Sequence, residues 1–358
     1  MEFREDGYVP IGHRPEWASI SPLRPPPASS EVVSIQSDPD HTDLLAYFWA
    51  AVTAGEHSPR VLDLTEEIIL NFNSAHFSVW AWRWECLEAL GTLQNAEGIA
   101  AETALLRRVA TENPKNYQLW NHRRKFALFR RICHIGDEME FSAGCLAYDA
   151  KNYHAWAHRQ AMLTVFGAEL KSNLWAEELV FTERLLRDDV RNNSAWTQRY
   201  FILEKGQKYY FQSLGTPSEF YNREVDFVVV KINLAPHNDA AWVYLRALTT
   251  GPGAPQWSLG FEERIRGVCM TSLELDASNV PALDLLADFY VQRAHILLQI
   301  ADSKQHAEEI AAEGCLQRRD EALGAAVEAA KELLVKLQVA DPARCAYYSH
   351  KLRQLEGM

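Results

Sequence analysis

Two histidines in the segment NYHAWAHR stand four residues apart, a spacing that lets both side chains bind one zinc ion from the same face of a helix. No glutamate follows His154, the first of them, so the general base of a zinc hydrolase is missing before His158. The six cysteines are also widely separated and form no C-x-x-C pair: Cys86, Cys133, Cys145, Cys269, Cys315 and Cys345. We therefore expect neither a metal site nor a disulfide framework in this chain.

A basic stretch is the second candidate for binding chemistry. The net charge of -12 and the isoelectric point of about 5.5 argue against a nucleic-acid-binding protein, which needs clustered positive charge. The stretch could present a positive face to an anionic ligand, or it could be a solvated helix face whose long stems cover apolar surface. Its members are Arg107, Arg108, Arg123, Arg124, Lys125, Arg130 and Arg131.

The length of 358 residues exceeds that of a single hydrophobic core, so the chain forms either two domains or an elongated array. Widely spaced cysteines fit a reducing compartment. The start MEFREDGYVP has no apolar core, no stretch reaches 18 apolar residues, and the end KLRQLEGM carries no lipidation motif. We expect a cytoplasmic protein without membrane insertion.

An internal repeat positions the residues named above. Five segments align on tryptophan: HFSVWAWR, NYQLWNHR, NYHAWAHR, NNSAWTQR and NDAAWVYL. Their tryptophans are Trp80, Trp120, Trp156, Trp196 and Trp242. The spacings of 40, 36, 40 and 46 residues are typical of arrays of helical hairpins.

Three further positions recur with the tryptophan. Asparagine stands four residues before it at Asn116, Asn152, Asn192 and Asn238, and Asn or Asp stands seven before it at Asn73, Asn113, Asp149 and Asp189. Arginine stands three residues after it at Arg83, Arg123, Arg159 and Arg199. Each copy thus predicts a turn, a capped helix start, a buried indole and an arginine on the same face. His122 occupies the position of His158, so the repeat itself accounts for that histidine.

Second helices with their own start signals lie between the copies, and no copy alternates with a period of two. The predicted fold is all-α, a right-handed superhelical crescent of antiparallel helical hairpins. We expect a flexible Pro-rich tail over residues 1–41, a hairpin array over 42–250 beginning at Thr42, and a C-terminal part over 251–358. That last part contains an atypical copy, with Leu283 in the tryptophan position, and capping helices.

The repeats resemble those of the protein prenyltransferase alpha subunits, whose units carry an Asn-aromatic-x-x-Trp-x-x-Arg core. The resemblance covers Thr42 to Phe289 and includes long runs such as SPRVLDLTEEIILNFNSAHFSVW, DAKNYHAWAHRQ and RDDVRNNSAWTQRYF. It is closest to the alpha subunits shared by protein farnesyltransferase and geranylgeranyltransferase type I. The chain departs from the motif at His76 and Phe77 of the first copy and at Asn193 of the fourth.

The resemblance implies a heterodimer with a beta subunit that holds the catalytic zinc and most of the isoprenoid pocket, with magnesium assisting departure of the diphosphate. Such an enzyme transfers a farnesyl or geranylgeranyl group from its diphosphate to the cysteine of a C-terminal CaaX motif. One alternative is a non-catalytic scaffold of tetratricopeptide type, although that class needs a steady period of 34 residues. Another is the alpha subunit of a Rab-type geranylgeranyltransferase, which depends on an escort protein.

The resemblance also implies roles for individual residues. Lys151 matches a lysine beside the diphosphate, where a preorganised ammonium stabilises the charge that grows on the leaving group. Tyr153 and His154 lie in a region that faces the acceptor peptide, and Tyr117 and Gln118 occupy the equivalent positions one repeat earlier. Packing within the array is the competing interpretation of both tyrosines.

Three further residues, Arg159, Asn192 and Trp196, match family positions tied to activity. Capping and core packing would produce the same loss on mutation, and we favour that structural interpretation.

Overall fold

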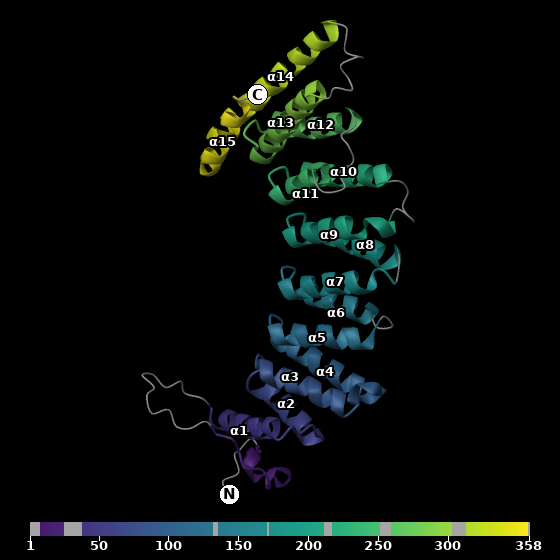
Figure 1. Ribbon diagram of the computed structural model, residues 1–358, viewed down its shortest axis with the longest axis vertical. Coiled ribbons are helices and arrows are strands. Elements are labelled where there is room, and N and C mark those ends of the chain that lie inside the picture. The colour runs from purple at the N-terminus through teal and green to yellow at the C-terminus, as the bar shows by residue number, and fades with distance from the viewer. Residues whose placement is uncertain are drawn as a thin grey trace, which may run out of the picture. The chain divides into compact units, whose positions relative to one another are not determined.

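The computed structural model describes residues 8–24, 38–131, 135–169, 172–210, 217–250, 259–302 and 313–356. Within these ranges the regular elements are all helices, and no residue is in a β-strand. The chain divides into two compact units, Met1–Phe166 and Gly167–Met358. In each unit the helices pair as antiparallel hairpins (Figure 1), which confirms the predicted all-α hairpin fold.

The first unit begins with two short 3-10 helices and continues with three helix pairs after α1. Its elements are η1 (Ile11–His13), η2 (Pro15–Trp17), α1 (Pro39–Thr53), α2 (Pro59–Asn71), α3 (Phe77–Ala89), η3 (Thr92–Gln94), α4 (Ala96–Glu112), α5 (Tyr117–Arg130), α6 (Ile135–Tyr148) and α7 (Tyr153–Phe166). Helix α2 packs on α3 and α6 on α7, and the second helices α3, α5 and α7 contact one another in turn.

The second unit continues the hairpins and ends in longer helices. Its elements are α8 (Ser172–Asp188), α9 (Asn193–Tyr210), α10 (Pro217–Leu234), α11 (Asp239–Thr250), α12 (Leu259–Leu275), α13 (Val280–Asp302), α14 (Glu313–Ala340), η6 (Pro342–Arg344) and α15 (Cys345–Leu355). Helix α14 packs along α13, and α15 packs on α14. Leu283, which replaces the repeated tryptophan, is buried in α13.

The repeated asparagine and tryptophan close each turn and also join neighbouring repeats. The Asn152 Oδ1 atom caps α7 by accepting the amides of His154 at 3.0 Å and Ala155 at 3.3 Å. Its Nδ2 atom donates to the carbonyl oxygen of Pro114 at 3.1 Å, which also accepts the indole N–H of Trp120 at 2.8 Å. One backbone carbonyl therefore binds the indole of its own repeat and the asparagine of the next.

The same double acceptor recurs along the chain, at the carbonyls of Ser74, Val190 and Pro236. Because one side-chain amide both caps a helix and binds the preceding turn, this position requires asparagine. These hydrogen bonds fix the position of a turn relative to the turn of the preceding repeat.

A buried glutamate on the first helix of a hairpin makes the second link between repeats. Glu102 of α4 accepts Arg83 of α3 at 2.7 Å and contacts His122 of α5 at 2.8 Å. Glu138 of α6 binds Arg123 and His158 in the same way. At Arg83, Arg123 and Arg199 the recurring arginine is therefore a buried structural cation whose carboxylate partner lies on the next hairpin.

The predicted flexible tail over residues 1–41 differs from the structure over residues 8–24. Ile11 and Trp17 are buried, and the Trp17 ring meets Tyr47 of α1 edge-on with centroids 5.7 Å apart. Proline and polar residues separate these apolar side chains in the sequence, so composition gave no sign that they pack.

Helix α1 begins at Pro39, three residues before the predicted start at Thr42. The side chain of Asp38 caps it by accepting the amide of Asp40 at 2.8 Å, and proline takes the first helical position. The boundary expected after residue 250 falls at residues 251–258, which lie outside the described residues.

Candidate functional site

Lys151 lies in the turn between α6 and α7. Its backbone amide donates to the Asp149 Oδ1 atom at 2.9 Å, and the buried Asn152 that follows it caps α7. The Lys151 side chain is exposed, and its ammonium makes no hydrogen bond or ion pair with any residue that the structure describes. The backbone is thus held on both sides while the charge stays available.

The equivalent lysine one repeat earlier has a different environment. Lys115 lies in the turn before α5, and its Nζ atom is 3.0 Å from the Asp149 Oδ2 atom. Its charge is therefore compensated within the protein. Two lysines at the same repeat position thus differ: Lys115 is paired, whereas the Lys151 ammonium has no partner among the described residues.

Three of the predicted peptide-contact residues lie together beside Lys151. Tyr117 and Tyr153, the first residues of α5 and α7, are 71% and 70% exposed. The His154 ring meets Tyr117 nearly perpendicularly, with centroids 4.3 Å apart, and Tyr153 at 5.6 Å. Gln118 is partly exposed on the same first turn of α5, where its amide donates to the cap Asn116. We call this surface the α5–α7 edge.

His154 forms hydrogen bonds as an uncharged imidazole. Burial lowers its pKa, and a hydrogen bond to the backbone carbonyl of Lys115 only partly opposes the shift. The imidazole is therefore uncharged at neutral pH, which leaves the exposed Lys151 ammonium as the free cation of this turn.

Arg159, Asn192 and Trp196 are all buried. The Arg159 guanidinium donates to the Met139 carbonyl at 2.6 Å and to the Ser142 hydroxyl at 3.0 Å. In the second unit, Asn192 caps α9 through the Ala195 amide, and the Trp196 indole donates to the Val190 carbonyl. These contacts agree with the structural interpretation that the repeat suggested.

His154 and His158 have separate partners, although their spacing would suit a zinc ion. His158 is buried with its Nε2 atom 2.9 Å from Glu138, whereas His154 packs on Tyr117. Among the side chains that are described, no three from His, Cys, Asp or Glu gather in a group that could hold a metal ion. Cys86, Cys145, Cys269 and Cys345 are free thiols.

The basic stretch divides between the interior and the surface. Arg123 is buried, binds Glu138 at 2.8 Å and stacks on the Phe141 ring. Lys125 lies 4.4 Å from the Trp84 ring centroid, so its stem and charge cover an aromatic face. These contacts favour the structural interpretation for these members.

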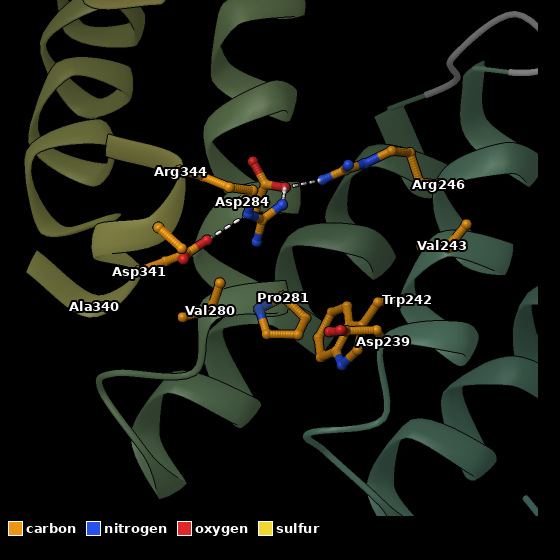
Figure 2. A pocket seen from close by; sticks show the side chains of 11 residues that line it. Asp239, Trp242, Val243, Arg246, Val280, Pro281, Asp284, Ala340, Asp341 and Arg344 are labelled. Carbon is orange, nitrogen blue, oxygen red and sulfur yellow. Dashed lines mark hydrogen bonds and ion pairs between the residues drawn. The ribbon is translucent and has the colours of Figure 1, made fainter. Parts of the chain in front are cut away.

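A pocket of about 500 Å³ lies in the second unit, between α11, α13 and the turn after α14. Figure 2 shows that Arg246 and Arg344 approach the same carboxylate, Asp284, at 3.0 and 3.6 Å. None of the predicted site residues lines this pocket. Both arginines are engaged in ion pairs, Arg246 with Asp284 and Arg344 with Asp284 and Asp341, so we assign no reacting group there.

The buried glutamates were not predicted from the sequence, although a signal was present. A glutamate precedes the tryptophan by 18 residues in four repeats: Glu102, Glu138, Glu178 and Glu224. Each of these glutamates also lies 20 residues before the side chain that binds it from the second helix of its hairpin. Those side chains are His122, His158, Gln198 and Tyr244. A charged residue at a fixed distance from a core tryptophan is therefore the signature to seek.

Comparisons with known proteins agree with this architecture. The model of the protein prenyltransferase alpha subunit repeat matches residues 99–128, 135–166 and 175–206, the α4–α5, α6–α7 and α8–α9 hairpins. The Candida albicans protein geranylgeranyltransferase-I complexed with GGPP is similar in fold, with a TM-score of 0.65 and 23% identity. The match covers 94% of this chain and 98% of that one.

No described helix is long and apolar enough to cross a membrane.

Curated relatives extend the similarity over most of the sequence. The protein farnesyltransferase/geranylgeranyltransferase type-1 subunit alpha of Dictyostelium discoideum is 38% identical over 247 residues, covering 69% of this chain and 73% of that protein. The protein of the same name from Pisum sativum is 34% identical over 288 residues and covers 80% of each chain. The chain therefore belongs to the protein prenyltransferase alpha subunit family.

Proposed function

We propose that this chain is the alpha subunit of a protein farnesyltransferase and geranylgeranyltransferase type I. With a beta-type subunit it would transfer a farnesyl or geranylgeranyl group from the diphosphate to the cysteine of a C-terminal CaaX motif. The observation that carries the proposal is the identity of 34 to 38% with relatives of that name over 73 to 80% of their length.

The reaction needs a thiolate and a stabilised leaving group. The cysteine sulfur forms a bond to C1 of the prenyl chain, the bond from C1 to the bridging oxygen breaks, and the diphosphate leaves with the electron pair. A zinc ion held by the beta-type subunit would supply the thiolate at neutral pH, because a coordinated thiol loses its proton.

Lys151 is the residue of this chain that we assign to the departing diphosphate, with magnesium as a second source of positive charge. Two features support the assignment: the ammonium is exposed without a partner among the described residues, and the turn beneath it is hydrogen bonded. Because the backbone of the turn is held, only the lysine side chain has to reorient when charge develops on the diphosphate.

The α5–α7 edge is the surface that we assign to the acceptor peptide. The exposed rings of Tyr117 and Tyr153 flank His154, whose neutral imidazole donates its N–H to the Lys115 carbonyl and can accept a hydrogen bond at its other nitrogen. Gln118 adds an amide on the same helical turn as Tyr117. The edge therefore combines apolar contact with uncharged polar groups, which suits a peptide end that carries an aliphatic segment.

Co-expression with a beta-type subunit tests the proposal. A stable equimolar complex is expected, and mass spectrometry should detect one prenyl group on a peptide that ends in CaaX but none on the matched peptide with serine in place of cysteine. Activity only on Rab proteins in the presence of an escort protein would instead identify a Rab-type subunit. Failure to bind any beta-type subunit would leave a helical-repeat scaffold as the better account.

A further inference from the structure

Asp149 joins the turn that carries Lys151 to the turn of the preceding repeat. Its Oδ1 atom accepts the Lys151 amide at 2.9 Å, and its Oδ2 atom is 3.0 Å from the Nζ atom of Lys115. Its backbone carbonyl accepts the Asn152 amide at 3.0 Å. Two oxygens of one carboxylate thus hold the Lys151 backbone and the neighbouring ammonium.

Both contacts of Asp149 have counterparts elsewhere in the array. The pair with the basic residue of the preceding turn recurs as His237, whose Nε2 atom is 3.4 Å from the Asp276 Oδ2 atom. The bond from a turn carboxylate to the amide two residues later recurs at Asp189 with Arg191 and at Asp276 with Ser278, so it belongs to the repeat. The pair with Lys115 lies at the surface, where the two side chains are 70% and 27% exposed. An exposed pair adds little to folding, so stability alone does not explain it.

The negative charge of Asp149 indicates a function for its ion pair with Lys115. The amide of Lys151 and then the ammonium of Lys115 lower the pKa of Asp149, so its carboxylate is ionised at neutral pH. That negative charge lies two residues from Lys151, where an anionic diphosphate is expected. Without Lys115 it would repel the anion and partly cancel the Lys151 ammonium.

We propose that Asp149 and Lys115 form a neutral clamp that holds the Lys151 turn in place while cancelling the carboxylate's own repulsion of the diphosphate. Both are positioning residues, and Lys151 remains the group that touches the leaving group. The inference rests on the proposed function, because it assigns the anion to Lys151.

Two double-mutant cycles on the complex with a beta-type subunit test the clamp, with the single-turnover transfer rate and the affinity for prenyl diphosphate as readouts. In the first cycle, Lys115→Ala should lower the affinity about threefold, because it exposes the Asp149 charge and an exposed pair is worth up to about a fivefold effect. The same change should have no effect in the Asp149→Asn background, where no charge needs cancelling. Equal losses in both backgrounds would overturn the neutralising role.

The second cycle separates positioning from folding. Asp149→Ala removes the bond to the Lys151 amide and should slow transfer about tenfold, whereas adding Asp149→Ala to Lys151→Ala should cost nothing more. A further loss in that background would show that Asp149 acts on structure and not through Lys151. Asp149→Asn, which keeps an oxygen acceptor for the Lys151 amide, should recover most of the transfer rate lost in Asp149→Ala.

The cycles also distinguish this inference from the proposed function. A slow Lys151→Ala complex with no coupling to Asp149 or Lys115 would overturn the clamp alone. A wild-type rate for Lys151→Ala would instead remove the assignment on which the clamp rests.

Discussion

The buried Glu102 carboxylate links two hairpins through Arg83 and His122, and Glu102→Gln is the change that isolates its charge. The substitution keeps the shape and an oxygen acceptor but removes the negative charge between Arg83 and His122. Arg83 is almost fully buried, and its other carboxylate contact is Glu66 at 3.3 Å, a side chain that is 47% exposed. A buried guanidinium would therefore lose its main counter-charge.

Two lines of reasoning give similar magnitudes. Breaking a buried ion pair by neutralising one partner costs about 3 to 5 kcal/mol, because the remaining charge stays desolvated. Burial alone would raise the pKa of Glu102, but Arg83 and His122 outweigh it and lower the pKa from 4.5 to about 2. That difference corresponds to about 3 kcal/mol of stability carried by the ionised form. We expect Glu102→Gln to lower the free energy of unfolding by about 3 kcal/mol at pH 7.

The pH dependence follows from the direction of the shift. A carboxyl group whose pKa is lower in the folded state stabilises the fold above its unfolded pKa and loses that contribution as the pH falls toward the folded value. The difference between wild type and Glu102→Gln should therefore be complete at pH 7 and shrink between pH 4.5 and about pH 2.

Urea unfolding followed by tryptophan fluorescence at several pH values measures this difference. Glu112→Gln is a matched control, because Glu112 lies on the same helix but is 52% exposed and, among the described residues, pairs only with the exposed Arg108. Its effect should stay within about 0.5 kcal/mol. Equal stability of Glu102→Gln and wild type at pH 7 would refute the view that this carboxylate links the hairpins.

Two further outcomes are expected. Trp156→Ala should destabilise the first unit by about 3 to 5 kcal/mol, because it truncates a buried indole that also binds the Ala150 carbonyl, and an unchanged thermal transition would show that the indole is not part of the core. Elemental analysis should find no stoichiometric zinc in the purified chain but equimolar zinc in the complex with a beta-type subunit; tight zinc in the single chain would mean that His154 and His158 have been misinterpreted.

The hairpins could be predicted because their signals are local. Asn152 and Trp156 act within one turn of helix, so a cap and a buried ring can be recognised from a short repeated motif. The packing of Ile11 and Trp17 could not be predicted, since it depends on a surface provided by helix α1, far along the chain. Local composition carries no information about such a surface.

In the candidate site, too, the local feature could be predicted and the contact between distant residues could not. The motif placed Lys151 in a turn before a helix, and the structure agrees. What separates it from Lys115 is a contact with Asp149, which lies 34 residues from Lys115 and in another repeat. Ion pairs between repeats depend on how the hairpins stack, so the availability of the Lys151 charge emerged only from the structure.

The most direct test of the account measures the chemical step in the complex of Lys151→Ala with a beta-type subunit. If Lys151 stabilises the departing diphosphate, the variant should fold, pair and retain zinc, yet its single-turnover rate should fall by about a hundredfold, or about 3 kcal/mol. Peptide affinity should change less, because the interaction strengthens as charge develops.

Lys205→Ala provides the matched control, because Lys205 is an exposed lysine on α9 that pairs with the neighbouring Glu204. It should leave the single-turnover rate unchanged. Added magnesium should offset part of the Lys151→Ala loss, since a divalent ion neutralises the same oxygens. A wild-type rate for Lys151→Ala with both substrates saturating would contradict the account and reduce this chain's part in the reaction to support of its partner.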